Sequence, residues 1–437
     1  MNGFDYTSLM SVFPPSSAVS DRGRLMVGGC DTVSLAQTYG TPLYVFDEAG
    51  IRARCAEFRN EFGSRYPDVS VIYACKAFTC LAMLQLITEE GLGLDVVSGG
   101  EIEYARVAGS PLGNISFAGN NKAPWELELA LNSAIRHIVV DNLPELELLA
   151  GMAGDRRADI LLRLSPGIDP HTHKFNTTGT VDSKFGLPRP DWDKAVLLAL
   201  GSPCVRLRGL HFHLGSGLFE VEPYLEAIGI VLEYAADIRR RYGFELEVLS
   251  IGGGYGVAYH PEDRPPSIAD FAEAITSQLR RKCSDLNLSL PQLVIEPGRA
   301  IVAQYGISLY TVGVIKEIPG IRTYVSVDGG MGDNIRYPLY GFVQETLVAN
   351  RAASPGTKKV TISGKYCESG DILVPEVTLP DIQSGDILAM AGSGAYAVPM
   401  ASNYNGNYRP AVVFVKDGTA RLVRCRETIE DLTGRDI

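Results

Sequence analysis

The sequence predicts an α/β fold: a (β/α)8 barrel of the TIM type plus a C-terminal all-β domain that the N-terminal segment completes. Three observations lead to this prediction. The 437 residues exceed one ordinary domain, so two domains are expected. Eight short apolar runs alternate with helical patterns between positions 69 and 295. After about Arg299 the helical patterns give way to strands and turns.

The eight apolar runs are short and rich in β-branched residues, as buried parallel strands are. They are Val69–Ala74, Gly91–Val97, Asn114–Phe117, His137–Val140, Asp159–Leu164, Leu207–His213, Glu247–Ile251 and Gln292–Ile295. Segments with helical spacing lie between most of them, namely Leu81–Ile87, Glu101–Ala108, Trp125–Leu131, Leu143–Ala150, Pro223–Arg239 and Ala269–Leu279. Eight strand–helix alternations fit a closed barrel better than an open sheet.

The C-terminal part reads as strands joined by turns. The predicted strands are Tyr305–Ile318, Arg322–Val327, Lys358–Ser363, Asp386–Ala391 and a hairpin within Ala411–Arg424. Asp417-Gly418 between two alternating strands is a strong hairpin signal. The first ~35 residues contain short β-like pieces. We therefore expect an N-terminal segment (1–36) that joins the β-domain, a barrel (37–299) and the β-domain itself (300–437).

Composition and charge exclude several classes of function. The formal net charge of −11 argues against nucleic acid, because a phosphate backbone requires a basic face. No apolar run reaches 18 residues, and Met1 to Ser11 lacks the pattern of a secretory signal, so we expect no membrane association. The eight cysteines are scattered without a C-x-x-C pair. This pattern predicts reduced thiols in a cytoplasmic protein.

Polar and glycine residues follow nearly every predicted barrel strand. In such barrels the chemistry lies at the C-terminal ends of the strands. The residues at these positions are Lys76, Ser98-Gly99-Gly100, Gly119-Asn120-Asn121, Asp141-Asn142, Arg163, His213 with Ser216, Gly252-Gly253-Gly254 and Glu296-Pro297-Gly298-Arg299. The sequence therefore predicts one functional rim.

The glycine triplet Gly252-Gly253-Gly254 follows the seventh predicted strand. Glycines let backbone N–H groups approach an anion closely, and the loop after strand 7 often holds a phosphate in these barrels. A phosphate site is the favoured interpretation. A tight turn without a ligand is the alternative.

Lys76 ends an otherwise apolar strand. A lone lysine in this position most often extends its amine to solvent. The alternative is a lysine whose pKa is lowered in a pocket of low dielectric constant, which is the condition for forming a Schiff base.

His211 and His213 are two residues apart, so on a strand both side chains face the same side. A metal pair is conceivable, but no third ligand with a suitable motif is apparent, and we predict no metal. A packed core histidine is the plain alternative. An imidazole stacked on an aromatic cofactor fits an inward position at a strand end better than either.

Eight motifs stand in order along the chain. They are Tyr73–Ala77, Asp95–Glu101, Gly209–Gly217, Ile251–Gly254, Glu296–Arg299, Asp328–Met331, Cys367–Asp371 and Gly394–Tyr396. Together they resemble the fold-type III pyridoxal-phosphate decarboxylases, and among these the diaminopimelate decarboxylase family, over roughly residues 35–425. The resemblance implies a TIM-type barrel, a C-terminal β-domain and a homodimer with shared active sites.

The resemblance also implies a role for each matching residue. Lys76 matches the lysine that carries the cofactor, His213 the residue stacked on its ring, and Glu296 the carboxylate facing the pyridine nitrogen. The remaining implied cofactor contacts are Ser216, Gly253, Gly254, Pro297, Gly298, Arg299 and Tyr396. Such a carboxylate favours the protonated ring nitrogen and makes the ring a better electron sink.

Cys367 matches a proton donor supplied by the other subunit. A thiol suits that task because its ordinary pKa is near 8.5, although an inert buried thiol is the alternative. The implied substrate contacts are Arg299, Arg336, Tyr340, Glu368 and Tyr396. An arginine in the substrate site suits a carboxylate that is retained, gripped bidentately, and Glu368 suits a retained ammonium. The segments Ile168–Phe175 and Asp182–Gly186 are also similar to the diaminopimelate branch, although His171 and His173 receive no role beyond that of loop residues near the rim.

These features predict pyridoxal-phosphate-dependent decarboxylation of meso-2,6-diaminopimelate to L-lysine, the last step of lysine biosynthesis. A decarboxylase of another basic amino acid, such as D- or L-lysine, ornithine or carboxynorspermidine, is the main alternative. A barrel racemase would not need the Cys367–Asp371 segment. A cofactor carrier without activity should have lost Lys76 or Cys367, and both are present.

Overall fold

The computed structural model describes residues 6–152, 154, 156–168 and 182–437. The chain divides into two compact units, each described here by itself. One unit comprises 1–53, 257–263 and 301–437, and the other comprises 54–256 and 264–300. His171 and His173 lie outside the described residues.

The second unit is a closed barrel of eight parallel strands in the order β10-β11-β12-β5-β6-β7-β8-β9. The strands are β5 (Val69–Ala74), β6 (Gly93–Val96), β7 (Ile115–Phe117), β8 (His137–Val140), β9 (Ala158–Arg163), β10 (Val205–His211), β11 (Val248–Ser250) and β12 (Gln292–Ile295). Each lies within one of the eight predicted apolar runs or overlaps it closely. The predicted TIM-type barrel is confirmed.

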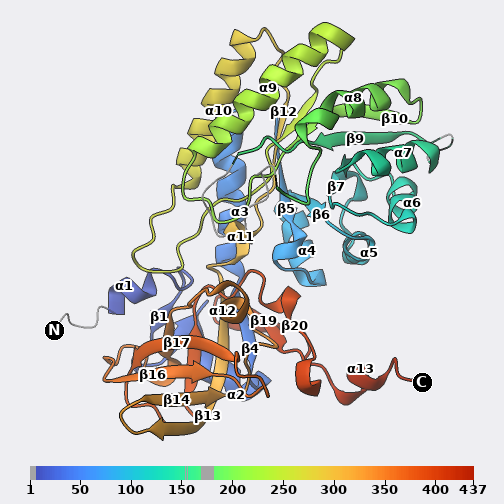
Figure 1. The fold of residues 1–437 in the computed structure, drawn as a ribbon. Coiled ribbons are helices and arrows are strands. Elements are labelled where there is room, and N and C mark those ends of the chain that lie inside the picture. Colours follow the sequence, from blue (N-terminus) through green and yellow to red (C-terminus); the bar gives the residue numbers. More distant parts are fainter. Residues whose placement is uncertain (1–5, 153, 155, 169–181) are drawn as a thin grey trace. The chain divides into compact units, whose positions relative to one another are not determined.

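Helices follow the strands on the outside of the barrel, and α9 and α10 run side by side (Figure 1). The helices of this part of the chain are α3 (Glu48–Gly63), α4 (Leu81–Glu89), α5 (Gly99–Ala108), α6 (Pro124–Asn132), α7 (Leu143–Met152), α8 (Trp192–Gly201), α9 (Glu222–Tyr242), α10 (Ile268–Asp285) and α11 (Arg299–Val302). Short 3-10 turns are η1 (Cys75–Ala77), η2 (Leu112–Asn114) and η4 (Arg189–Asp191). Helix α5 shows common capping residues at both ends. Ser98 caps α5 by accepting from Glu101 N, and Gly109 ends it in a left-handed conformation.

Buried aliphatic side chains pack together within the barrel unit. Six of them form one cluster, namely Ile72, Ala118, Val139, Leu161, Val248 and Val294. Inward side chains from neighbouring strands stack in layers in this fold, which makes the barrel a packed core and leaves the strand ends for chemistry.

The other unit is built on a nine-stranded sheet with the order β17-β16-β14-β13-β4-β19-β20, in which β18 pairs with β13 and β15. The strands are β4 (Leu43–Asp47), β13 (Gly306–Ile318), β14 (Arg322–Val327), β15 (Thr346–Val348), β16 (Lys358–Ser363), β17 (Ile372–Leu379), β18 (Ile387–Met390), β19 (Ala411–Lys416) and β20 (Thr419–Arg424). A small sheet of β1 (Ala18–Val19), β2 (Leu25–Val27) and β3 (Cys30–Asp31) accompanies it. The helical elements are α1 (Tyr6–Met10), α2 (Thr32–Tyr39), α12 (Arg336–Tyr340), η5 (Ala349–Arg351), η6 (Val398–Met400), η7 (Tyr404–Gly406) and α13 (Ile429–Thr433). The predicted all-β domain is confirmed.

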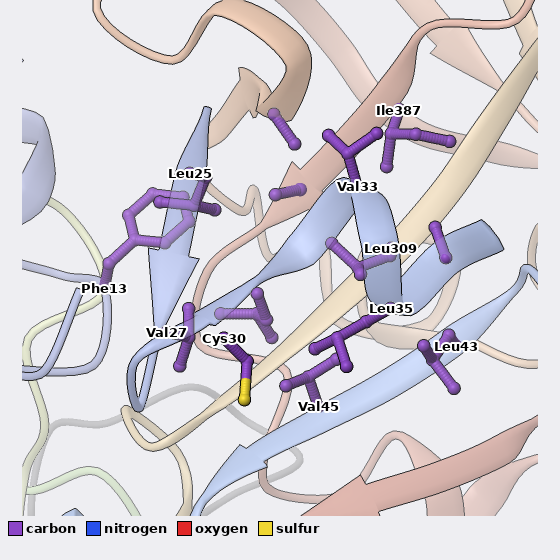
Figure 2. Packing of buried hydrophobic residues seen from close by; sticks show 14 of the residues in the cluster. Phe13, Leu25, Val27, Cys30, Val33, Leu35, Leu43, Val45, Leu309 and Ile387 are labelled. Carbon is purple, nitrogen blue, oxygen red and sulfur yellow. The ribbon is translucent and has the colours of Figure 1, made fainter. Parts of the chain in front are cut away.

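Strand β4 accounts for the main difference from the expected boundaries. We expected the N-terminal contribution to this unit to end at 36, whereas the unit extends to Ala53. The reason is that β4 is buried along its whole length and pairs antiparallel with β13 and parallel with β19. Figure 2 shows Leu43 and Val45 packed with Leu309, Leu35 and their neighbours in the core of this unit.

The predicted hairpin is present between β19 and β20. Lys416 pairs with Thr419, and the two residues between them, Asp417 and Gly418, have φ of 51° and 76°. Two consecutive positive φ values define the type I′ turn that an Asp-Gly pair favours. No helix in the described part of the chain is both long and apolar enough to cross a bilayer.

The stability of the barrel should depend on pH through His137, which is 3% exposed at the start of β8. Burial, reinforced by Arg136 and Arg208, lowers the pKa of His137 to about 3. Between pH 6.5 and pH 3 the imidazole of His137 is therefore protonated in the unfolded chain and neutral in the folded chain. This difference lowers the free energy of unfolding as the pH falls through that range, by about 2 kcal/mol at pH 5. We expect the His137→Gln variant to lose less melting temperature between pH 7.5 and pH 5 than the wild type. Equal losses would contradict this assignment.

Candidate active site

The barrel gathers ionisable side chains at the C-terminal ends of its strands. Strands β6, β9 and β10 bring Asp95, Arg163 and His211 there, and Lys76 and Glu296 directly follow β5 and β12. Four of these five side chains are buried, with Lys76 as the exception. Charged side chains are almost never buried without partners, so this group requires a functional explanation.

Lys76 lies in the turn η1, between the buried residues Cys75 and Ala77. Its side chain is exposed, so this chain by itself does not bury the amine in the pocket of low dielectric constant that was considered as one of two interpretations. The reason is its place on the rim, beyond the last residue of β5. The charge of Lys76 nevertheless acts on Asp95, Glu101 and His213, so the amine is close to the other candidate residues.

Glu296 is held as an ionised carboxylate inside the barrel. Ser250 donates its hydroxyl at 2.7 Å, and the Nε2 atom of His211 lies 3.2 Å from the carboxylate. Burial acts to raise the pKa of Glu296, but His211, Ser250 and His213 outweigh it and lower that pKa to about 2. A carboxylate fixed in this way favours a positively charged partner.

Asp95, unlike Glu296, has a raised pKa. Burial raises its pKa well above the ordinary value and the charge of Glu296 adds to this, although Lys76 opposes it. Its Oδ1 atom is buried and has no hydrogen-bond partner among the described residues. Two neighbouring carboxyl groups whose environments separate their pKa values are typical of active sites.

His213 is oriented by the glycine loop. Its Nδ1 atom accepts a hydrogen bond from Gly253 N at 3.2 Å, so a proton on the neutral ring belongs on Nε2. Burial lowers the pKa of His213 well below its ordinary value, and the charges of Lys76 and Arg163 lower it further. The ring is therefore neutral at physiological pH.

Close backbone packing explains the glycines of this loop. A Cβ on Gly253 would lie 2.1 Å from Glu296 O, and one on Gly254 would lie 2.4 Å from Gly215 O. Gly254 also has a φ of 118°, which side chains disfavour. The loops after β10, β11 and β12 can thus lie against one another only because these positions lack side chains.

A hydroxyl and a guanidinium meet beside this loop. Arg299, which is 7% exposed, donates from Nε to Ser216 Oγ at 2.9 Å. The next residue, Gly217, donates its N–H to Gly254 O at 3.0 Å, so Ser216, Gly254 and Arg299 adjoin one another. A buried guanidinium beside a hydroxyl and a glycine backbone suits a phosphate group.

Two other predicted residues of the rim use their backbone atoms within the protein. Gly253 N donates to His213, and Pro297 O accepts from Ala74 N at 3.1 Å. Gly298 lies against the end of β5, because a Cβ there would be 2.9 Å from Ala74 Cβ. The structure therefore places these three residues where they support the loops around Lys76 and Ser216.

The remaining predicted site residues lie in the other unit. Arg336 begins the short helix α12 and is 3% exposed, and its guanidinium lies over the rings of Phe342 at 4.8 Å and Tyr340 at 5.4 Å. A guanidinium among aromatic rings keeps its orientation and binds carboxylates bidentately. Tyr396 has a φ of 59°, which is rare for a residue with a side chain and is typical of functional positions.

Cys367 and Glu368 are exposed on the loop between β16 and β17. Cys367 N donates to Asn405 Oδ1 at 2.9 Å, and Glu368 Oε1 accepts from Gly370 N at 3.1 Å. The buried carboxylate of Asp371 accepts from Met331 N at 2.6 Å and Tyr366 N at 2.8 Å. Asp371 thereby ties the Cys367 loop to the segment that leads into Arg336.

Asp333 anchors that same segment from the core. Tyr310 donates its hydroxyl to Oδ2 at 2.6 Å, and Gly330 N donates to Oδ1 at 2.9 Å. Burial raises the pKa of Asp333 to about 7. The Gly329–Arg336 segment is therefore fixed by two carboxylates, one of which belongs to the Cys367 loop.

The structure shows contacts of residues to which the sequence assigns no definite role. Asp95, Arg163, His211 and Ser250 all lie at the ends of barrel strands. From the sequence, Arg163 is placed on the predicted rim, His211 is left with several alternatives, Asp95 is part of a motif only, and Ser250 is not singled out. Arg163 pairs with Asp141 at 3.4 Å, and its guanidinium lies 4.6 Å from the centre of the Phe185 ring. No group of three or more potential metal ligands occurs within the described residues.

The comparisons with known proteins agree with this geometry. Residues 48–303 match the model of the pyridoxal-dependent decarboxylase family, in its pyridoxal binding domain. The chain therefore belongs to the pyridoxal-dependent decarboxylases, enzymes that use pyridoxal phosphate.

Individual relatives that are similar over almost the whole chain are diaminopimelate decarboxylases. Diaminopimelate decarboxylase of Bacillus subtilis is 44% identical over 97% of this chain and 97% of its own length. That of Halalkalibacterium halodurans is 44% identical over 97% and 98%. The crystal structure of diaminopimelate decarboxylase from M. jannaschii superposes with a TM-score of 0.90 at 33% identity, covering 97% of this chain and 98% of its own. A second crystal structure of that protein contains L-lysine.

Proposed function

We propose that this chain decarboxylates meso-2,6-diaminopimelate to L-lysine, the last step of lysine biosynthesis. The observation that carries the proposal is the rim of the barrel, where an amine, an ionised buried carboxylate and a Ser–Arg anion site lie together. Relatives at 44% identity over almost the whole chain support the choice of substrate.

The residues of the rim fit pyridoxal phosphate, group by group. Lys76 would supply the amine for its aldehyde, and Ser216, Gly254, Gly298 and Arg299 form the side of the rim that would hold its phosphate. Glu296 would offer a carboxylate to its ring nitrogen, and the neutral ring of His213 would offer a flat partner. When bound, the cofactor delocalises the electron pair that remains after the carboxylate leaves.

The residues of the chain prepare and control that chemistry. Glu296, kept ionised by His211 and Ser250, would hold a proton on the ring nitrogen. Gly253 fixes the ring of His213 through Nδ1, which sets its orientation against the cofactor. These groups are ordered by protein contacts, so little reorganisation is needed during the reaction.

The substrate would be recognised at its second amino-acid head. Arg336 would grip the carboxylate that is retained, and Glu368 would pair with the adjacent ammonium. Binding at this end leaves the departing carboxylate free of a salt bridge, which would otherwise stabilise the ground state. Cys367 would then deliver a proton to the carbon that has lost its carboxylate, and Arg299, Tyr340 and Tyr396 would complete the site.

We expect Arg336→Ala to raise the KM for meso-diaminopimelate by an amount equivalent to about 2–5 kcal/mol, because a buried charge pair is lost. Cofactor absorbance should not change. Inhibition by 1,5-diaminopentane, which has two amines and no carboxylate, should change little. Arg322→Ala, an exposed arginine of the same unit, is the matched control. A KM equal to that of the control would remove Arg336 from the substrate site.

We further propose that the protein is a homodimer with shared active sites, located in the cytoplasm. The exposed Cys367 and Glu368 are available to a second copy, and the eight cysteines are all free thiols, as in a reducing compartment. Light scattering on the purified enzyme should give twice the mass of the chain. A monomer that retains full activity would contradict the shared site.

A substrate panel tests the proposed function. Release of CO2 is measured with meso-diaminopimelate, L-lysine, D-lysine, L-ornithine and carboxynorspermidine. We expect kcat/KM for meso-diaminopimelate to exceed all others, since the other amino acids lack the retained carboxylate that Arg336 would bind. Faster turnover of lysine, ornithine or carboxynorspermidine would assign the chain to that substrate instead.

A further inference from the structure

A cavity of about 340 Å³ lies at the end of the barrel opposite to the candidate active site. Its lining includes the first residues of β5 and β6 and the residues that lead into β7 and β8, four strands that are neighbours in the barrel. The last turn of α3, with Arg59 and Gly63, completes it. A volume of this size is sufficient for a small metabolite.

The charge of this cavity is of one sign. Arg59 and Arg136 are the charged residues among the described residues that line it, and no acidic residue does. Asp68, whose charge acts on Arg136, accepts a hydrogen bond from Gln292 at 2.7 Å and is not part of the lining. A concave site with two guanidinium groups and no carboxylate favours an anion.

Both guanidinium groups are held in place by neutral partners. Arg136 donates to Ser70 Oγ at 3.0 Å and to Gln292 Oε1 at 2.5 Å, and Arg59 donates to Glu90 O at 2.5 Å. Arginine has five N–H donors, so donors remain on each side chain after these bonds. Burial also lowers the pKa of Arg136, and a bound anion would relieve this cost of desolvation.

Gly91 also lines the cavity. Its φ of 76° is a conformation that favours glycine. A Cβ at this position would lie 3.6 Å from the Nη1 atom of Arg59, an ordinary van der Waals distance, so the guanidinium of Arg59 lies beside this part of the lining.

We propose that this cavity is a second binding site, for a small organic anion with two or more carboxylate groups, which Arg59 and Arg136 grip from two sides. The site lies on the chain's own barrel and is independent of the proposed substrate, since none of the candidate catalytic residues lines it.

Isothermal titration calorimetry of the holoenzyme tests this proposal, with citrate as the probe and inorganic phosphate as the comparison at equal ionic strength. We expect saturable citrate binding that Arg59→Gln and Arg136→Gln each weaken about tenfold or more, equivalent to one lost charged contact. Phosphate, with one anionic group, should bind at least about tenfold more weakly. Arg106→Gln, an exposed arginine of α5, should bind citrate as the wild type does.

Three results would overturn the site: no saturable citrate binding by the wild type, unchanged affinity in Arg59→Gln, or equal weakening in Arg106→Gln. Phosphate that binds as tightly as citrate would overturn the assignment to polycarboxylates. Arg59 is exposed on α3, so its variant is expected to fold even if Arg136→Gln does not. Citrate binding is measured without turnover, so its outcome does not depend on which substrate the active site takes.

Discussion

Replacing Lys76 by alanine should abolish the visible absorbance of protein-bound pyridoxal and reduce turnover by on the order of 10³–10⁴-fold. The side chain lies in the turn after β5, and its charge acts on Asp95, Glu101 and His213. Without the amine, the cofactor can be held only through its phosphate and ring. The measurement is the absorbance spectrum of the purified variant together with CO2 release.

Lys194→Ala is the matched control, because Lys194 is an exposed lysine of α8 in the same unit. This variant should retain both the spectrum and the activity. Fluorescence of the protein and its melting temperature should show that Lys76→Ala is folded. A folded Lys76→Ala variant that keeps the absorbance band and normal turnover would contradict the assignment of the amine.

Replacing Cys367 by alanine should lower kcat by about 10²–10⁴-fold while the cofactor stays bound, since general acid catalysis contributes that much. The thiol is exposed and its backbone is fixed by Asn405, which suits a group that must reach a substrate. In D2O the wild type should place deuterium on one face of the carbon that loses CO2. The variant should give both faces, as seen by NMR of the product lysine.

Cys425→Ala is the control for this experiment, because Cys425 is also an exposed thiol of the same unit. It should behave as the wild type.

Mixing the inactive Lys76→Ala and Cys367→Ala variants under conditions that allow subunit exchange should restore about a quarter of the activity, since half of the dimers then contain one intact site. Unchanged kinetics in Cys367→Ala would remove its role, and no recovery on mixing would contradict the shared site.

The barrel could be predicted from the sequence because its signals are local. Each strand is an apolar run of a few residues, and capping residues such as Ser98 mark the helices that follow. Strand β4 was not predicted, since Leu43–Asp47 pairs with β13 and β19, more than 250 residues away. Leu43-Tyr44-Val45-Phe46 is an apolar run like those of the barrel strands, but a local run does not tell which sheet a strand joins.

The site was predictable to the extent that its residues stand at strand ends. Lys76, His213, the glycine loop and Glu296 follow their strands directly. The contacts that define their chemistry were not, because the pairing of β10, β11 and β12 brings His211 and Ser250, from the first two of these strands, to Glu296 at the end of the third. The tie from Asp371 to Met331 likewise depends on the tertiary fold, since 40 residues separate the two.

The exposure of Lys76 shows a further limit of sequence reasoning. An apolar strand does not by itself tell whether the lysine at its end is exposed or buried, and the structure shows that the turn η1 carries the side chain past the end of the barrel. The chemistry proposed for the amine then depends on its neighbours at the rim, Asp95, Glu101 and His213, more than on burial by the strand.

The most direct measurement is reduction of the holoenzyme with borohydride, followed by proteolysis and mass spectrometry. If the amine of Lys76 and the Ser216–Arg299 anion site share one cofactor, the phosphopyridoxyl group will be found on the peptide that contains Lys76, in about one copy per chain. A label on another lysine, or none on a yellow and active enzyme, would contradict the account.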